Sequence, residues 1–381
     1  MLSSAMLMLM TSIATAPAEV SKENLRATLE HLSTYSTRNT NTDECEKAVH
    51  AIADRFRAIP GLDVEVMPYE VKAGRRIVKD RTVYQVVATL RGTTEKRVIV
   101  GGHLDTINLS GDPMTVKAPG INDDGSGVAL TLECARLLAA QPGKFRNTLV
   151  FVAFTGEEQG LIGSGALAAR AKKEKWVIEA MLNNDTVGSS AAKGLKDKKR
   201  VRLFSEEETT HNSREAARFI EWNAKGKVKG VSPWLVFRRD RFQRGGDHTP
   251  FNREGFNAVR FVEAVERLDV QHTDKDLIEH IDFDYLAAVT ALNAHTLKTF
   301  ANADDAPTNV AYDARQAHDT TLRWKAKPGV QYRVYWRESS SSTWQGSELA
   351  GAVESYTVKK KNKDDHVFAV GAEGGVPVSA G

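Results

Sequence analysis

Short, largely β-branched apolar runs alternate with helix-periodic segments through most of the chain, and this order restricts it to an α/β fold. Apolar residues at helical spacing predict two helices between Lys22 and Phe56, followed by helices over Val128–Ala140 and Phe283–Lys298. We therefore expect a mixed, mostly parallel sheet sandwiched by helices. The runs that predict strands are Val83–Leu90, Val98–Gly101, Thr148–Phe154, Ala180–Asn184 and Asn257–Val262.

A histidine and an aspartate follow the strand predicted at Val98–Gly101, in the order His103-Leu104-Asp105. Ligands of α/β proteins usually bind just beyond the carboxyl ends of strands. Neutral imidazole is a favoured zinc ligand, and a nearby carboxylate can hold the other ring N–H. By itself the pair also fits an ordinary hydrogen-bonded histidine, so its meaning depends on the other strand ends.

The segment APGINDDGSG places Asn122, Asp123 and Asp124 between Gly120 and Gly125, just before a predicted helix. The two glycines permit a tight turn. Neighbouring carboxylates repel each other unless a cation compensates them. An Asx-rich turn that caps a helix needs no cation, so both interpretations stay open for this segment alone.

Two adjacent carboxylates, Glu157 and Glu158, follow the strand predicted at Thr148–Phe154. The pair could begin a helix, where acids interact with the positive end of the dipole. In metal-assisted hydrolysis, however, one carboxylate binds the ion and its neighbour moves a proton from water to the leaving amine. Asp185 and His272 also follow predicted strands, so histidines and carboxylates at separate strand ends together predict a metal centre.

In the motifs GGHLDT, APGINDDGSG, FTGEEQGLIGS, NNDTVG, GGDHTPF and QHTDKD, the chain resembles the co-catalytic two-zinc exopeptidases. That family includes bacterial leucyl aminopeptidases and glutamate carboxypeptidase, with glutaminyl cyclase as a more distant relative. The resemblance extends from about His31 to Phe300. It implies the zinc-peptidase fold, two Zn²⁺ ions per chain and peptide hydrolysis by a water molecule that the ions activate.

The resemblance also assigns the metal ligands residue by residue. It implies that His103 and Asp185 bind one zinc ion and that Glu158 and His272 bind the other. Asp123 would bridge the two ions and set their spacing. These residues are the expected donor set of the site.

Three further details follow from the same resemblance. Glu157 is expected to be the general base and acid, and Asp105 is expected to orient His103. The peptide bond Asp123–Asp124 is expected to be cis. Together with the ligands, these residues make up the predicted catalytic machinery.

The chain departs from the family pattern at positions around the ligands. In GGDHTPF, Gly246 stands where serine is common, and Asp247 and His248 are expected to support the site or line the substrate pocket. Gln271 stands where an aromatic residue is frequent, and Asn184–Thr186 replaces more apolar neighbours. The departures leave the ligands intact and leave the shape of the pocket undetermined.

We expect a secreted, zinc-dependent aminopeptidase whose partner is a peptide or small amide. The alternatives on the same scaffold are a carboxypeptidase, an amidohydrolase of small conjugates or a glutaminyl cyclase. A non-catalytic, receptor-like module could also retain this fold, but every ligand position and Glu157 are filled, which argues against it. A net charge of +3 with interleaved signs gives no indication of a nucleic-acid partner.

The two ends of the chain differ in amino-acid composition from the middle. Residues 1–18 are apolar, too short to span a bilayer comfortably and followed by small residues, so we expect a signal peptide and a secreted or periplasmic protein without a transmembrane segment. We assign 19–301 to the zinc exopeptidase domain. Two cysteines, Cys45 and Cys134, allow one disulfide or two unpaired thiols.

Residues 302–381 begin with a polar, Pro-containing linker and continue with short strand-like runs. The early Trp324, the tyrosine-rich run Tyr332–Trp336 and the late run His366–Ala372 resemble a fibronectin type III module, a small β-sandwich. Trp336 and Trp344 could contact a surface or a polymer, or they could be core or edge residues.

Overall fold

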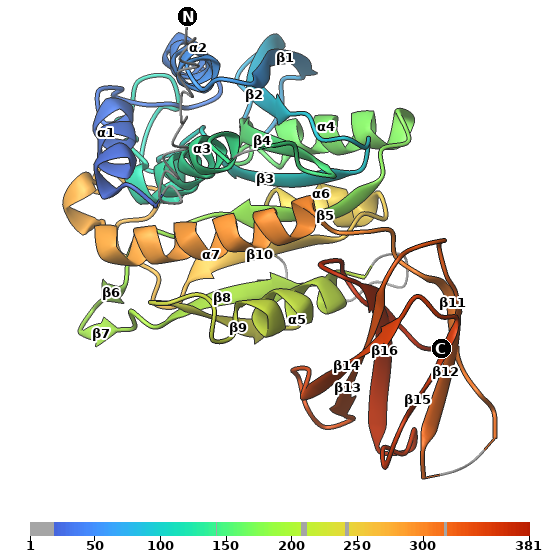
Figure 1. Cartoon of the computed structure of the whole chain (residues 1–381). Helices are drawn as coiled ribbons and strands as arrows, with labels where there is room; N and C mark the ends of the chain where they lie inside the picture. The colour runs from blue at the N-terminus through green and yellow to red at the C-terminus, as the bar shows by residue number, and fades with distance from the viewer. Residues whose placement is uncertain (1–18, 142, 207–211, 241–243, 316–317) are drawn as a thin grey trace, which may run out of the picture.

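A large sheet between two layers of helices forms the body of the protein (Figure 1). The computed structural model describes residues 19–381 except 142, 207–211, 241–243 and 316–317, so the predicted signal peptide lies outside the described residues. The strand order is β1-β2-β4-β3-β5-β10-β8-β9, and the central strands β4, β3, β5 and β10 are parallel. The fold class is therefore as predicted. The strands are β1 (Leu62–Val71), β2 (Arg81–Leu90), β3 (Arg97–His103), β4 (Thr148–Phe154), β5 (Ile178–Asn184), β8 (Arg200–Ser205), β9 (Ser232–Val236) and β10 (Ala258–Glu263).

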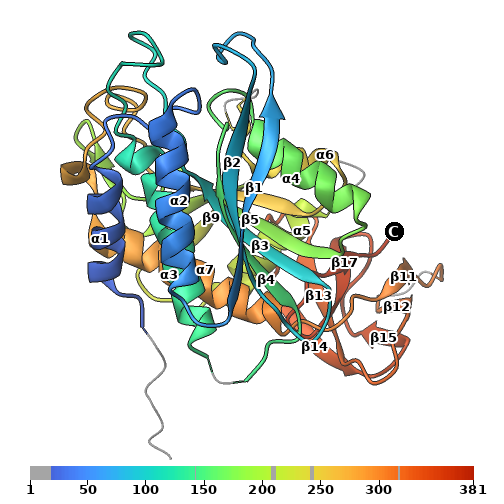
Figure 2. The same ribbon diagram turned by 90° about the horizontal axis from the view of Figure 1, so that it is seen from above.

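Helices cover both faces of this sheet (Figure 2). One face carries α1, α2, α3, α5 and α7, and the other carries α4 and α6. A short hairpin, β6 (Ala191–Ala192) and β7 (Leu195–Lys196), projects from the body. The helices are α1 (Lys22–Leu32), α2 (Asp43–Arg57), α3 (Ser126–Ala139), α4 (Ile162–Lys173), α5 (Ser213–Ala224), α6 (His248–Arg253) and α7 (Phe283–Ala301), with single turns η1 (Ile121–Gly125) and η2 (Ile278–His280).

The central strands are buried on both faces, which explains their continuous apolar sequences. Every residue of β4, TLVFVAF, is buried; Phe151 packs with the α3 side and Phe154 with the α6 side. The outer helices α1 and α2 are amphipathic instead. Helix α2 begins where the Thr42 hydroxyl accepts a hydrogen bond from the Cys45 amide, and it buries one face that includes Ile52. Local sequence and packing thus favour the same elements.

The carboxyl ends of the parallel strands β4, β3, β5 and β10 lie side by side and form what we call the carboxyl edge of the sheet. The loops that leave this edge carry the predicted site. Cys45 and Cys134 are both buried free thiols. Over the part of the chain that the structure describes, no helix combines the length and apolarity needed to cross a bilayer.

A fully buried arginine, Arg38, connects the segment between α1 and α2 to this edge. Its guanidinium donates to the carbonyl oxygens of Leu104, Pro119 and Gly120, at 2.7, 2.5 and 2.8 Å. Two of these carbonyls lie just before η1, which contains Asp123. Arg38 therefore fixes the backbone that leads into Asp123, the predicted bridging ligand.

Replacing Arg38 by Met should lower the free energy of unfolding by about 3 kcal/mol or more, because three carbonyls each lose the hydrogen bond from its buried guanidinium. Arg38→Lys should recover only part of this loss, since an ammonium group cannot reproduce the planar fork. Urea unfolding measures both variants, with the exposed Arg75→Met as the control. A loss below about 1 kcal/mol for Arg38→Met would contradict the assigned role.

The C-terminal residues form two small antiparallel sheets that face each other across a core containing Leu322, Trp324, Tyr332 and Phe368. One sheet has the order β11-β12-β15 and the other β14-β13-β16-β17. We call residues 308–381 the C-terminal module. Its strands are β11 (Thr308–Tyr312), β12 (Thr320–Lys325), β13 (Tyr332–Glu338), β14 (Gly346–Gly351), β15 (Ser355–Val358), β16 (His366–Ala372) and β17 (Val378–Ser379).

The C-terminal module packs against α5 through aromatic side chains. Tyr335 meets Phe219 and Trp222 edge to face, with ring centroids 6.2 and 6.4 Å apart, and Trp344 lies 5.8 Å from Tyr335. Trp344 is only 2% exposed, so this tryptophan is a core residue and cannot contact an outside polymer. Trp336 is half-buried on the module's own core.

Candidate metal centre

The structure brings together all of the predicted metal ligands, from five different segments. His103 is the last residue of β3, Asp123 lies in η1, Glu158 follows β4, Asp185 follows β5, and His272 lies between β10 and η2. Because the parallel strands end at one edge, residues that are far apart in sequence meet there. The Asp123–Asp124 peptide bond is cis, as predicted.

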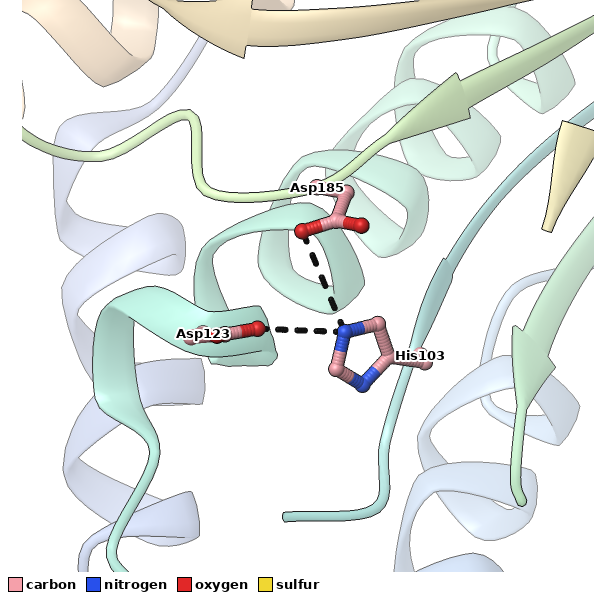
Figure 3. Close-up of side chains that lie close together, drawn as sticks. All are labelled: His103, Asp123 and Asp185. Atoms are coloured by element: carbon pink, nitrogen blue, oxygen red, sulfur yellow. Dashed lines mark ion pairs between the residues drawn. The ribbon is translucent and has the colours of Figure 1, made fainter. Parts of the chain in front are cut away.

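Two donor sets share Asp123 as their common member. In the first, His103 Nε2 lies 3.1 Å from Asp123 Oδ1 and 3.9 Å from Asp185 Oδ1 (Figure 3). In the second, His272 Nε2 lies 3.2 Å from Asp123 Oδ2 and 3.0 Å from Glu158 Oε1. The two oxygens of Asp123 thus face different histidines. The donor atoms within each set all lie within 4.8 Å of one another.

These donors have the chemistry of a zinc site. Imidazole nitrogens and carboxylate oxygens are the usual zinc ligands beside thiolates. Glu158 Oε1 is buried and has no hydrogen-bond partner among the described residues, although His272 Nε2 is only 3.0 Å away. A buried carboxylate oxygen without a donor is costly unless a cation fills the place. The residues therefore fit a bound cation.

The electrostatics of the cluster point in the same direction. Burial raises the pKa of Glu157 well above its usual range; His103 opposes this shift, and the charges of Glu158 and Asp185 add to it. Burial likewise raises the pKa of Asp124. So many buried carboxylates repel one another in the absence of a compensating positive charge.

The predicted role of Asp105 needs a correction at the level of atoms. The backbone carbonyl of Asp105, and not its carboxylate, lies 3.0 Å from His103 Nδ1, while the carboxylate is 3.7 Å from that nitrogen. The Asp105 carboxylate instead accepts the backbone N–H groups of Glu157 and Glu158, at 3.2 and 3.1 Å. These two amides hold it away from the ring, so Asp105 positions the glutamate pair as well as the histidine.

A second group of residues holds the η1 turn in place, and the sequence prediction did not include it as support. Asp276 accepts the backbone N–H of Asn122 and of Asp123. Glu263 accepts both a side-chain N–H of Asn122 and the backbone N–H of Ser189. Nothing in the local sequence connects these acids to η1, because Glu263 ends β10 and Asp276 lies in the following loop.

Gln271, which stands where the family often has an aromatic residue, donates from Nε2 to Asp123 Oδ2 at 2.6 Å. The residue before His272 thus binds the shared aspartate directly. His272 itself has a left-handed backbone, with φ of 57°. This departure from the family pattern therefore changes the surroundings of Asp123 and leaves the donor set complete.

The GGDHTPF loop adjoins the metal centre. A Cβ at Gly246 would come within 2.9 Å of Asn183 Nδ2 and 3.1 Å of Arg260 Cδ, so a serine here would require these side chains to shift. Arg260 is fully buried and pairs through Nη2 with Asp185 Oδ2 at 2.9 Å. Burial raises the pKa of Asp247 to about 7. The sequence feature that could have identified Arg260 as a buried partner is its place inside the largely apolar run AVRFVE.

His248 and Asp247 are both buried, and His248 Nε2 contacts Glu206 Oε1 at 3.3 Å. Other residues line the pocket in front of the metal centre, and support of the site stays a prediction for both. That pocket has a volume of about 440 Å³. Its lining consists of Arg76, His103, Leu109, Asp123, Glu157, Glu158, Gly160, Leu161, Asp185, Arg244, Gly245 and His272.

The fold and the donor set together define a zinc metallopeptidase of the α/β class. The sequence profile of peptidase family M28 matches residues 85–297. A protein of Leptosphaeria maculans named "probable zinc metalloprotease" is 34% identical over 93% of this chain and 92% of its own length. The chain therefore belongs to peptidase family M28.

Solved structures have the same fold at low sequence identity. The LapA aminopeptidase of Legionella pneumophila is 18% identical, with a TM-score of 0.62 over 75% of this chain and 73% of its own. The zinc aminopeptidase BSAP of Bacillus subtilis is 18% identical, with a TM-score of 0.56 over 72% and 94%. A glutaminyl cyclase of Fimbriiglobus ruber is 18% identical, with a TM-score of 0.58 over 74% and 96%.

Proposed function

We propose that the protein is an aminopeptidase that works with two zinc ions. The observation that carries this proposal is the position of Asp123, whose two oxygens face two separate histidine–carboxylate sets. His103 and Asp185 would hold one ion, Glu158 and His272 would hold the other, and Asp123 would contact both. The similarity to the LapA and BSAP aminopeptidases supports the choice of reaction.

When bound, the zinc ions would supply Lewis acidity toward a water molecule and the substrate carbonyl. Glu157 lines the pocket, and its backbone is fixed by the Asp105 carboxylate. Its carboxylate would take a proton from the attacking water and return it to the departing amine nitrogen. Asp105 and Arg260 would act by holding His103 and Asp185 in place.

The substrate panel that tests this reaction has three arms. We expect hydrolysis of aminoacyl p-nitroanilides and of peptides with a free amino terminus, because the neighbours of known reaction include aminopeptidases. Peptides blocked at the amino terminus test for carboxypeptidase activity, and peptides that begin with glutamine test for cyclisation. Turnover confined to either of the last two arms would contradict the proposal.

Metal content gives an independent prediction. The purified protein should contain two zinc ions per chain, and Asp123→Ala should lose both because each set loses a member. His272→Ala should retain one ion, since the His103 and Asp185 set stays intact. Inductively coupled plasma mass spectrometry measures these contents, with His280→Ala as a control on a histidine outside the sets. Full zinc occupancy in Asp123→Ala would overturn the assignment.

We also propose that the C-terminal module is a fibronectin type III-like sandwich. The support is its strand order, in which the first, second and fifth strands form one sheet and the remaining strands form the other. Export of the chain and the division at residue 302 remain predictions. Sequencing the amino terminus of the mature protein tests the first of these, with a new terminus after Ala16 or Ala18 as the expected result.

A further inference from the structure

Two arginines, Arg76 and Arg244, line the pocket in front of the metal centre. They come from opposite parts of the chain: Arg76 lies in the loop between β1 and β2, and Arg244 lies just before the GGDHTPF loop. From these two guanidinium groups we infer that the pocket selects substrates with a carboxylate group close to the scissile bond. This inference rests on the proposed peptidase function and specifies its substrate class.

The side chain of Arg76 reaches the metal centre through a hydrogen bond to the backbone of Glu158. Its Nη1 donates to the backbone carbonyl oxygen of Glu158 at 2.5 Å. Because Glu158 is a member of the second donor set, this bond places the guanidinium beside the site of reaction. No carboxylate of the described residues forms an ion pair with Arg76, which leaves its other N–H groups available to a substrate.

Arg244 has only a distant carboxylate partner. Its Nε lies 3.8 Å from Asp240 Oδ2, and about a third of its side chain is exposed (33%). The same carboxylate oxygen lies 3.5 Å from Nη1 of the buried Arg260. Arg260 has a closer partner in Asp185, at 2.9 Å, while Asp240 at 3.8 Å is the nearest carboxylate that pairs with Arg244 among the described residues. Arg244 is therefore only weakly paired, and its guanidinium contributes positive charge to the pocket.

The charged groups of the lining fall into two kinds. Its carboxylates are Asp123, Glu157, Glu158 and Asp185, which lie at the place where divalent ions would bind. Arg76 and Arg244 belong to neither donor set, so their guanidinium groups stay available to a substrate anion. An arginine fork matches a carboxylate in geometry as well as in charge, because it can donate two parallel hydrogen bonds.

The apolar part of the lining is small. Among the described residues that line the pocket, Leu109 and Leu161 are the only large apolar side chains. Leu109 is 62% exposed, so it forms part of the rim. A pocket lined by two arginines and by so little apolar surface favours a substrate with an acidic group over a substrate with a bulky aliphatic side chain.

The carboxylate could belong to an acidic side chain or to the free carboxyl terminus of a short peptide, and paired substrates distinguish these sources. One pair compares an amino-terminal glutamate with glutamine; the other compares a dipeptide acid with its amide. We expect kcat/KM to be at least about tenfold higher for the acid in one pair. Equal values within both pairs would overturn the inference, while hydrolysis itself would still support the proposed function.

Variants then connect the preference to the two arginines. Arg76→Gln and Arg244→Gln should each lower the acid-to-neutral ratio of kcat/KM by about tenfold, and the ratio should also fall with added salt. Arg75→Gln removes the same charge from the same loop but does not line the pocket, so it should leave the ratio unchanged. An equal loss in Arg75→Gln would indicate a general charge effect and overturn the assignment.

A binding measurement gives a readout that does not depend on turnover. Calorimetry on the Glu157→Gln variant should detect tighter binding of the preferred acid than of its neutral partner, and weaker binding when Arg76→Gln or Arg244→Gln is added. If no aminoacyl substrate is hydrolysed by the wild-type protein, the proposed function fails, yet this experiment still decides on carboxylate selection. Equal affinities for acid and neutral partner would refute the inference.

Discussion

Replacing Glu157 by Gln should leave the zinc content unchanged and lower kcat by about 10³-fold. The residue lines the pocket beside His103 and Glu158, but neither donor set that shares Asp123 includes it. A glutamine retains the size and the hydrogen-bonding capacity of the side chain, yet it cannot accept a proton from water. Steady-state kinetics and metal analysis on the same preparation measure the two effects together.

The control for this variant is Glu279→Gln, which makes the same chemical change at an exposed position outside the pocket lining. It should retain wild-type turnover and zinc content. Loss of zinc from Glu157→Gln would make Glu157 a ligand, and normal turnover would remove it from the proton transfer. The two possible failures of the assignment are therefore distinguishable by the two measurements.

The centre of the fold was predictable because burial on both faces leaves a strong signal in the sequence. The runs that became β3, β4, β5 and β10 are mainly apolar, and a ligand candidate stands at the end of each or in the loop that follows. A buried strand has few ways to carry a charged residue, so a histidine or an acid at its end stands out. Most of the donor set could therefore be read from the sequence.

The edges of the sheet were harder to predict. Strand β1 alternates between exposed and partly buried residues, includes Glu65 and Pro68, and pairs with one neighbour only. Strands β8 and β9 lie at the other edge and include Arg202 and the exposed Trp234. One solvated face weakens the apolar pattern, so these strands were missing from the prediction.

Contacts between distant segments could not be predicted from local patterns at all. Arg38 reaches three carbonyls, Asp276 holds η1, and the Asp105 carboxylate binds two backbone amides instead of a ring nitrogen. Each of these depends on how loops from different strands meet. Motif spacing identifies residue types at the site, but the partner of each atom follows only from the fold.

The C-terminal module shows the same limit at the level of domains. A change of composition after Thr299 predicted a separate sandwich with a boundary near Asn302, and the strands are present. Yet Tyr335 and Trp344 of this module belong to the same hydrophobic cluster as Phe219 and Phe300 of the main body. Polar contacts join them as well, since Arg218 Nε donates to the carbonyl oxygen of Ser342 at 3.0 Å. The two parts therefore share a core.

Because of this shared core, Trp344→Ala should lower the free energy of unfolding of the whole chain by about 3–5 kcal/mol. The indole is 2% exposed and lies against Tyr335, so its removal leaves a cavity at the junction of the two parts. Such a loss is a large fraction of the ~5–15 kcal/mol that stabilises an ordinary protein. Denaturant unfolding, followed by tryptophan fluorescence and by activity, measures the effect.

The matched control is Trp234→Ala, because Trp234 is 43% exposed on the edge strand β9, where its ring lies against the guanidinium of Arg200. This change should cost about 1 kcal/mol or less. In the wild-type protein, fluorescence and activity should be lost in one transition, since neither part can separate without exposing Phe219 and Tyr335 to water. Two separate transitions, or a small effect of Trp344→Ala, would mean that the module folds independently of the body that carries the metal centre.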